Sequence, residues 1–328
     1  MAKTVRFHQI GGPEVLVLDD VDIPEPGPGE VRIRARALGV NRAEAMFRSG
    51  AYVHDPVLPA GIGYEVAGEV DAVGAGVDLA NGTPVSVVPA FGMNDYPVHG
   101  ELVIAPAHAV VQHPENLTWT DAAAVWMPFV TAYGGLIARA GLTRGDTVLI
   151  TAASSSVGLA AIQIANMIGA RPVALTRSSR KQQALLDAGA AEVIATSEQD
   201  TAAEVRRLTG GAGARVAFDP VGGPGLADLT ASLAPEGILI VYGALSEETT
   251  PLPVMDVLGK HLTLRGYELF EITTDPEQLS EAVAFVRDGL QRAALKPMLA
   301  KVFPLDQVVE AHQYMESNEQ FGKIVITV

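Results

Sequence analysis

The sequence predicts an α/β protein with two parts, a β-rich first part and a doubly wound parallel sheet in the second. Short strand-like runs, separated by Pro and Gly clusters, fill the chain up to Thr120. Beyond Thr120, apolar strands alternate with helical segments, a pattern typical of parallel sheets with helical crossovers. The segment Thr147–Ala165 reads as a strand, a tight turn of small residues and the start of a helix.

The composition sets limits on size, partners and chemistry. With 328 residues, 48% hydrophobic and 19% charged, the chain is long and apolar enough for two folded domains. A net charge of −15 argues against nucleic acid or an anionic membrane as the main partner. The absence of cysteine excludes disulfides, thiolate zinc sites and a cysteine nucleophile. No run of 18 apolar residues lacks charges or helix breakers, so we expect a soluble cytoplasmic protein.

The first part has the texture of a sheet. Apolar and polar residues alternate from Val31 to Ala37, as in a strand with one solvated face, and Val66–Val73 is a second strand-like run. The Pro/Gly cluster at residues 24–30 precedes the first of them and indicates a turn region.

The second part begins with one long predicted helix, Asp121–Ala140. Helices are also predicted at Lys181–Ala188 and Ala227–Leu233. A last strand pair around a helix at Leu305–Glu316 is expected to return to the first domain. The strands predicted for the parallel sheet are Thr147–Thr151, Pro172–Thr176, Glu192–Ala195, Arg215–Asp219, Ile238–Tyr242 and Leu262–Gly266, and the last pair is Ala300–Phe303 and Lys323–Val328.

The turn at residues 152–156 is a candidate phosphate site. Exposed N–H groups and the positive end of the helix dipole at such a strand-to-helix turn suit a pyrophosphate. We therefore expect Ser154, Ser155 and Ser156 to face the pyrophosphate of a dinucleotide, with Val157 beside them. The alternative is an ordinary buried turn between a strand and a helix.

The loop after the second strand of the predicted sheet is cationic. Arg177, Ser178, Arg180 and Lys181 lie within five residues, and no acid occurs from Arg171 to Lys181. In dinucleotide folds an acid here binds the ribose of NAD, whereas basic groups accept the 2′-phosphate of NADP. The pattern favours NADP, the alternative being a solvated helix start at which cations are unfavourable.

Four blocks carry a resemblance that covers essentially the whole chain. They are residues 38–52, residues 63–74, Val130–Tyr133 and residues 322–326. On these blocks the chain resembles the medium-chain dehydrogenase/reductase superfamily, and within it the zinc-free quinone oxidoreductases related to zeta-crystallin. The resemblance implies a GroES-like catalytic domain, 1–122 with 296–328, a Rossmann domain, 123–295, and a cleft between them.

Two departures from the superfamily pattern bear on function. Zinc-dependent members carry Cys at the position of Asn41 and His at that of Tyr64, and none of the seven histidines forms an H-x-x-x-H pair, so no metal is expected. The dinucleotide turn keeps only its last glycine, Gly158. The serines must then adopt negative φ or bear strain.

The resemblance also suggests residues that act on the substrate. Asn41 is expected beside the nicotinamide, where it would bind cofactor or substrate, and Tyr52 matches a tyrosine that donates to the forming enolate. Tyr64 is expected to line the pocket. The alternatives are an Asx turn for Asn41, packing for Tyr52 and a bonded core tyrosine for Tyr64.

The remaining expected cofactor contacts follow the same resemblance. Thr131 stands at the phosphate or ribose position, Phe270 near the nicotinamide and Lys323 at a terminal phosphate contact, the alternative being an ordinary strand-start lysine. Val221 is expected near the adenine. The nicotinamide half is expected to pass residues that follow the fifth strand, Gly243, Ala244 and Leu245.

The hypothesis that unites these features is an NADPH-dependent reductase of quinones or α,β-unsaturated carbonyls that uses no metal. Two alternatives remain open, an enoyl-thioester reductase of lipid or polyketide metabolism and a non-catalytic NADPH-binding protein. A homodimer is expected, because this family commonly pairs Rossmann sheets, with Ile238–Tyr242 as the outer edge strand.

Overall fold

The computed structural model describes residues 1–112 and 117–328. Contacts divide the chain into two compact units. Unit 1 comprises Met1–Met127, Ile272–Glu281 and Pro297–Val328, and unit 2 comprises Pro128–Glu271 and Ala282–Lys296. The predicted domain limits, 1–122 with 296–328 and 123–295, remain our proposal for the segments that fold together.

Unit 1 is built on two sheets. The larger one has the order β15-β16-β3-β5-β6-β8, with β7 also paired to β3, and the smaller one has the order β2-β1-β4. The long central strand β3, Glu30–Val40, buries alternate residues, as its apolar/polar pattern predicts. The other strands are β1 Ala2–Phe7, β2 Leu16–Val21, β4 Ala60–Gly61, β5 Glu65–Val73, β6 Pro84–Val87, β7 Leu102–Pro106, β8 Val110–Val111, β15 Leu299–Pro304 and β16 Lys323–Thr327.

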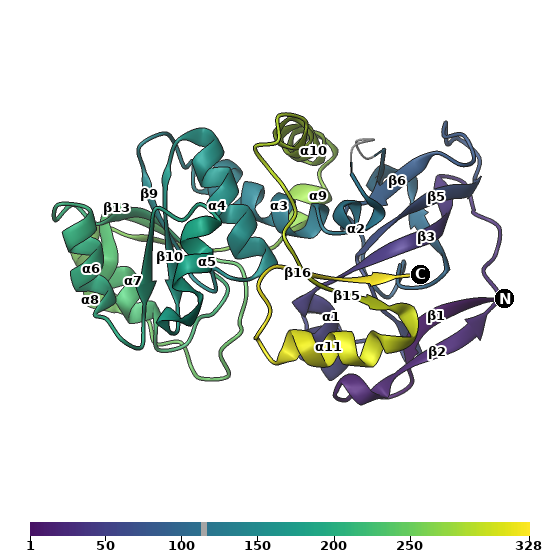
Figure 1. The fold of residues 1–328 in the computed structure, drawn as a ribbon, viewed down its shortest axis with the longest axis horizontal. Coiled ribbons are helices and arrows are strands. Elements are labelled where there is room, and N and C mark those ends of the chain that lie inside the picture. The colour runs from purple at the N-terminus through teal and green to yellow at the C-terminus, as the bar shows by residue number, and fades with distance from the viewer. Residues whose placement is uncertain (113–116) are drawn as a thin grey trace. The chain divides into compact units, whose positions relative to one another are not determined.

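The C-terminal strands join this sheet directly. In Figure 1 the yellow β16 lies beside the purple β3, and the two pair antiparallel with Ile324 opposite Val40. The register places the first residue of β16 next to the last residues of β3. The helices of unit 1 are α1 Arg42–Ser49, α2 Trp119–Ala122 and α11 Val308–Glu316, with short 3₁₀ turns at Pro13–Val15, Ala107–Ala109 and Leu305–Gln307.

Unit 2 contains a six-stranded parallel sheet in the order β11-β10-β9-β12-β13-β14. This is the doubly wound order 3-2-1-4-5-6 of dinucleotide-binding folds. The fold class, a GroES-like β-rich part and a Rossmann sheet, is therefore confirmed. The strands are β9 Thr147–Ile150, β10 Arg171–Thr176, β11 Glu192–Ala195, β12 Ala214–Asp219, β13 Leu233–Val241 and β14 Thr263–Gly266.

Helices follow these strands, and their apolar faces pack on the sheet. One buried cluster joins Leu149 of β9 and Leu239 of β13 to Val205, Leu226 and Leu229 from the helices. The helices are α4 Ser156–Ile168, α5 Gln182–Asp187, α6 Thr201–Leu208, α7 Leu226–Ser232 and α8 Val254–Lys260, with a 3₁₀ turn at Ser179–Lys181. The division between the units falls within α3 Trp126–Tyr133, α9 Phe270–Thr273 and α10 Pro276–Gln291.

The turn after β9 keeps Ser155 out of the strained left-handed conformation. Ser155 has φ −72° and is the N-cap of α4, where its hydroxyl accepts a hydrogen bond from the Gly158 N–H at 3.0 Å. The left-handed residue of the turn is Ala152, with φ 45°. The turn is thus closed by a serine cap and one strained alanine.

The single helix expected at Asp121–Ala140 is wrong. The segment forms α2, α3 and a π-helix at Gly134–Arg139. Pro128 lacks an N–H and its ring excludes the carbonyl of the preceding turn, so α3 starts anew just before it. A Cβ on Gly135 would lie 2.4 Å from Phe218, and the π-helix forms at this close approach. Trp119–Arg139 is long and apolar enough to cross a membrane, but 78% of its apolar window is buried inside the protein, as in a core helix.

The prediction of the edge strand is also wrong. The strand predicted at Ile238–Tyr242 is β13, which pairs with β12 on one side and with β14 on the other. The outer strand on that side is therefore β14, because the sixth strand extends the sheet by one position.

A substitution of Gly158 tests how closely the turn packs against the start of α4. A Cβ at this position would lie 2.7 Å from both Cα and the carbonyl oxygen of Ala153, so Gly158→Ala is expected to lower the free energy of unfolding by about 1–3 kcal/mol. Chemical denaturation would measure this loss. The control is Gly259→Ala in α8, where nothing lies within 4 Å, and which should stabilise the protein by about 0.5–1 kcal/mol. Equal stability of Gly158→Ala and the wild type would contradict this account.

Candidate functional site

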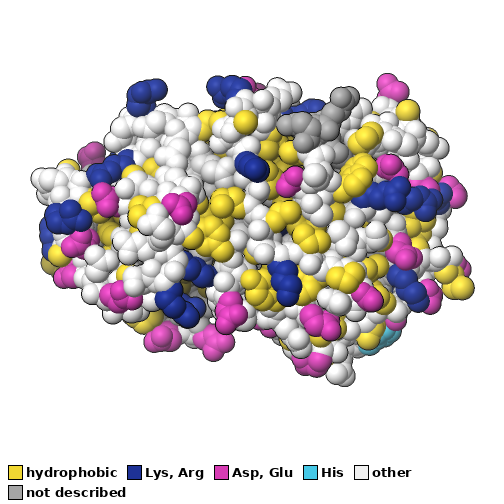
Figure 2. All heavy atoms as spheres, in the orientation of Figure 1, with side chains coloured by type: hydrophobic (Ala, Val, Ile, Leu, Met, Phe, Trp, Pro, Cys, Tyr) yellow, Lys and Arg dark blue, Asp and Glu magenta, His cyan; other side chains and the backbone are white. Residues whose placement is uncertain are grey.

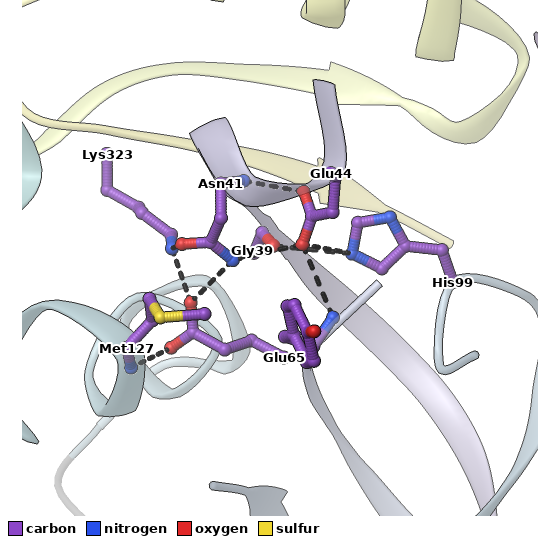
Figure 3. A network of polar contacts seen from close by, with 8 residues as sticks. Gly39, Asn41, Glu44, Glu65, His99, Met127 and Lys323 are labelled. Carbon is purple, nitrogen blue, oxygen red and sulfur yellow. Dashed lines mark hydrogen bonds and ion pairs between the residues drawn. The ribbon is translucent and has the colours of Figure 1, made fainter. Parts of the chain in front are cut away.

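A buried ion pair lies where three strands of unit 1 meet. The Lys323 ammonium, at the start of β16, contacts the Glu65 carboxylate, at the start of β5, and both side chains are 1% exposed. The second oxygen of Glu65 accepts from the Met127 N–H at 2.8 Å, as Figure 3 shows. A buried carboxylate is tolerable only when it is paired and hydrogen-bonded in this way.

Asn41 is the hub of this network. Its Oδ1 accepts from Lys323 at 2.5 Å, and its Nδ2 lies 3.1 Å from Glu65, 3.1 Å from Glu44 and 3.0 Å from the Gly39 carbonyl oxygen. The hydrogen bonds of the amide therefore go to groups within unit 1 (Figure 3). The structure gives both Asn41 and Lys323 partners inside the protein, and their expected contacts with a cofactor stay predictions.

Glu44 ties the network to helix α1. It forms a capping box with Asn41, whose backbone N–H donates to Glu44 Oε2 at 2.6 Å. Glu44 Oε1 also accepts from the backbone N–H of Tyr64 at 3.3 Å. Burial raises the pKa of Glu44 to about 7, although the bonds from Asn41 and the charge of Lys323 oppose the shift.

His99 closes the other side of the network. Its Nε2 lies 3.3 Å from the Gly39 carbonyl oxygen and 3.9 Å from Glu44. Burial lowers the pKa of His99 to about 3, so the imidazole is neutral near pH 7 and donates no charge to Glu44.

Tyr52 and Tyr64 come together. The Tyr64 hydroxyl donates to the Tyr52 hydroxyl at 3.3 Å. Tyr64 is 1% exposed, whereas Tyr52 is half-buried and packs edge-on against Phe47. Two of the three residues predicted to act on the substrate therefore form one pair, while Asn41 belongs to the adjoining charged network.

In unit 2, the serine turn and the cationic loop meet. The Lys181 ammonium lies 3.2 Å from the Ser154 hydroxyl, across 27 residues of chain. In the first turn of α4 the N–H groups of Ser156 and Val157 have no acceptor within the helix. The structure thus places a lysine beside a helix N-terminus, an arrangement that suits a phosphate.

Most of the other expected cofactor residues of unit 2 follow the carboxyl ends of its strands. Arg177 and Arg180 are exposed after β10, with Ser178 half-buried between them. The loop with Val221 meets the loop at Gly243–Leu245, since the Leu245 N–H donates to the Pro220 carbonyl at 3.0 Å. Thr131 is buried in α3, and Phe270 starts α9.

Comparison with known proteins places this architecture in a family. Residues 27–115 match the alcohol dehydrogenase GroES-like domain, and residues 156–288 match the zinc-binding dehydrogenase family. The human quinone oxidoreductase is 31% identical over 329 residues, which cover 99% of this chain and 98% of that protein. The chain belongs to the quinone oxidoreductase-type medium-chain dehydrogenases/reductases.

Solved structures of this family agree with the whole fold. A mycobacterial protein complexed with NADPH has a TM-score of 0.91 and 32% identity, with 100% of both chains covered. The Escherichia coli quinone oxidoreductase complexed with NADPH has a TM-score of 0.90 and 28% identity, again with 100% of both chains covered.

The zinc suggested by one family description does not fit the side chains of this member. Within residues 1–112 and 117–328, no group of three or more His, Cys, Asp or Glu side chains could hold a metal ion. Asn41 and Tyr64, which stand where zinc-dependent members carry ligands, are engaged with Lys323 and Tyr52 instead.

Three residues of the site were not predicted from the sequence: Glu44, Glu198 and His99. The N-x-x-E spacing of Asn41 and Glu44 is a capping-box signal that would have found Glu44. Glu198, whose carboxylate binds the Ser179 N–H at 3.0 Å beside the cationic loop, lies after the third strand and carries no local signal. His99 also has none, since only the fold brings it to Gly39.

The buried Glu44 makes stability depend on pH. Because its pKa is raised from 4.5 to about 7 in the folded protein, the stabilisation from its protonated form is complete below pH 4.5 and is lost as pH rises to about 7. Glu44→Gln keeps a hydrogen-bond acceptor but cannot titrate. It should remove the contribution of Glu44 to the dependence of the unfolding free energy on pH, which is up to about 1.4 kcal/mol per pH unit. Urea unfolding between pH 5 and 8 measures it.

The control for this experiment is Glu310→Gln, on an exposed position of α11. This variant should keep the wild-type dependence of unfolding free energy on pH. A Glu44→Gln profile that parallels the wild type over pH 5–8 would show that Glu44 does not titrate in this range.

Proposed function

We propose that this protein is an NADPH-dependent oxidoreductase that transfers hydride to a quinone or an α,β-unsaturated carbonyl compound without a metal. The observation that carries the proposal is the contact of Lys181 with Ser154, which brings the cationic loop to the serine turn at the start of α4. The NADPH in the two related structures and the names of the relatives support it.

The residues of unit 2 fit the cofactor. The pyrophosphate would lie on the N–H groups of Ser156 and Val157, with Ser154 and Lys181 beside it, where the helix dipole favours an anion. Ser155 supports the turn as its cap, and its hydroxyl is occupied by Gly158. Arg177, Ser178 and Arg180 would accept the 2′-phosphate.

The residues of unit 1 fit the acceptor side. When bound, NADPH supplies the hydride. Tyr52, half-buried and held by Tyr64, would donate a proton to the acceptor oxygen as charge develops on it. Because Asn41 and Tyr64 replace the Cys and His ligands of zinc-dependent members, these side chains would not hold a metal that polarises an alcohol, and an acceptor that is already electrophilic is the easier substrate. Asn41 and Lys323 would hold the site in shape.

The enoyl-thioester alternative needs free basic side chains to bind a carrier phosphate. The arginines of β3 are already paired, Arg32 and Arg34 with Asp71 and Arg36 with Glu69. Arg48, 1% exposed, pairs with Glu316. These pairs, and relatives named quinone oxidoreductase, disfavour that alternative.

The cofactor assignment is tested by steady-state kinetics with NADPH and NADH over a panel of quinones, enones and enoyl thioesters. Arg177→Ala combined with Arg180→Ala should raise KM for NADPH about 10-fold or more, because charge-assisted hydrogen bonds to the 2′-phosphate are lost, and change KM for NADH, which has no 2′-phosphate, less than about two-fold. Arg215→Ala, at the amino edge of the same sheet, is the matched control.

The outcomes of this experiment distinguish the proposed function from its two alternatives. A wild-type preference for NADH, or equal effects of the double substitution on both cofactors, would contradict NADPH specificity. NADPH binding in a fluorescence titration with no turnover on any acceptor would favour the non-catalytic alternative. Turnover confined to thioesters would favour the other alternative.

We also propose that the protein is a soluble, cytoplasmic homodimer that pairs through β14. The outer strand β14 leaves one row of backbone groups unpaired, and unpaired edges favour association. Near it in sequence, exposed apolar side chains gather on α8 and the preceding loop: Leu252, Val254, Met255 and Leu258.

On the face seen in Figure 2, acidic and basic side chains are interspersed, as expected for a protein that binds neither nucleic acid nor membrane.

Light scattering tests the dimer. The wild type should have twice the chain mass of 34.3 kDa, and Met255→Glu combined with Leu258→Glu should shift it to the monomer because buried charge opposes association. Val302→Glu, at an exposed apolar position of β15, should leave the mass unchanged. A monomeric wild type would remove this proposal and leave the proposed reaction untouched.

A further inference from the structure

The contact between the hydroxyls of Tyr64 and Tyr52 joins the charged network of unit 1 to the proposed proton donor. We propose that Tyr64, with Glu44 behind it, is a positioning residue that sets the orientation and proton-donating strength of Tyr52. The inference rests on the proposed function, and it adds roles for two side chains that do not themselves touch the substrate.

The end of helix α1 sets the backbone at Tyr52. Gly50 caps the helix in the left-handed conformation, with φ 73°, and the Ala51 N–H donates to the Met46 carbonyl at 2.8 Å. The Tyr52 ring then meets the buried ring of Phe47 edge-on, with centroids 6.3 Å apart and planes at 89°. These contacts limit the ring to a small range of orientations while leaving the residue half-buried.

Tyr64 is held more firmly. Its ring is 1% exposed and lies against Phe91, with centroids 6.1 Å apart. Gly63 before it has φ 111°, and a Cβ there would lie 2.1 Å from His99, so the backbone is pressed against the imidazole. The Tyr64 hydroxyl is therefore a fixed donor against which Tyr52 is oriented.

Glu44 connects this donor to the ion pair. Its Oε1 accepts from both the Tyr64 backbone N–H and the Asn41 side chain, and Asn41 in turn binds Lys323. Lys323 and Glu65 are the charged side chains that act on Glu44, and His99 faces it from the loop before β7. The path from Lys323 to Tyr64 thus passes through groups that are buried and hydrogen-bonded, and Figure 3 shows it as far as Glu44.

The proposed proton transfer balances as follows. The hydride that bound NADPH would supply, leaving NADP⁺, forms a C–H bond at the acceptor carbon and moves an electron pair onto the acceptor oxygen. The O–H bond of Tyr52 breaks as its proton moves to that oxygen, and the resulting phenolate accepts the hydrogen bond of Tyr64. Water then returns a proton to Tyr52. Because a hydrogen bond to a charged oxygen is stronger than one to a neutral oxygen, Tyr64 stabilises the phenolate more than the phenol.

The distance of 3.3 Å is long for a bond between hydroxyls. Catalytic hydrogen bonds are often long before substrate binds and tighten in the complex. The effect of Tyr64 should therefore be seen in kcat rather than in the KM of either substrate.

A double-mutant cycle of Tyr52→Phe and Tyr64→Phe tests the proposal with an enone and NADPH. Tyr64→Phe should lower kcat about 10-fold, leave KM for NADPH within about two-fold and raise the solvent deuterium isotope effect, because proton transfer becomes slower. In the Tyr52→Phe background, Tyr64→Phe should have no further effect. The matched control is Tyr96→Phe, which removes a phenol hydroxyl bonded to Glu30 at 2.9 Å and should leave kcat unchanged.

A second pair of variants tests Glu44. Glu44→Gln keeps an acceptor for the Tyr64 N–H and should retain the coupling between the two tyrosines, whereas Glu44→Ala should reduce it. If Glu44→Ala does not fold, the tyrosine cycle alone decides, since each tyrosine variant loses only a hydroxyl.

The outcomes separate this inference from the proposed function. Additive losses in the double variant, or an unchanged kcat in Tyr64→Phe, would overturn the positioning role while wild-type turnover upholds the reductase. An unchanged kcat in Tyr52→Phe would overturn the role of Tyr52 as donor in the same way. A wild type with no NADPH-dependent turnover would instead overturn the proposed function itself.

Discussion

The ion pair between Lys323 and Glu65 is the interaction on which the rest of unit 1 depends. It joins the starts of β16 and β5 and holds Asn41, which caps α1 through Glu44. Removing one partner of such a pair would leave an uncompensated charge in the interior, at a cost of about 3–5 kcal/mol. The burial that makes the pair costly to break also raises the pKa of Glu44 and lowers that of His99. The ion pair and the backbone of Tyr64 are joined through Asn41 and Glu44.

Unit 2 solves a different problem, the close approach of a helix to a strand end. Gly158 is kept because any Cβ would meet the backbone of Ala153, whereas the other glycine positions of the resemblance are occupied by Ala152, Ser155 and Ser156. The structure accommodates this by capping α4 with Ser155 and placing the left-handed backbone at Ala152. A turn that has lost most of its glycine pattern can therefore keep a helix N-terminus open to an anion.

The sequence predicted local elements well where the pattern itself carries the information. Short apolar runs bounded by Gly and Pro predicted every strand of the parallel sheet. The predicted bounds lie within a few residues of the observed ones, except that β13 starts earlier than predicted, at Leu233. The prediction of one helix at Asp121–Ala140 failed, because apolar composition alone does not show the break before Pro128 or the packing of Gly135 on Phe218. The edge strand was misplaced because strand order is a property of the whole sheet.

By itself, the sequence determined the fold class, the serine turn and the cationic loop after the second strand, since these depend on residues close together in the chain. Only the tertiary structure decided what the polar side chains do. Lys323 reaches Asn41 across 282 residues because β16 pairs with β3, and there its charge serves a buried network. Tyr64 meets Tyr52 because a capped helix and a glycine pressed against His99 aim both rings at one point. Burial and the pairing of strands far apart in the chain determine these contacts, and local sequence patterns predict neither.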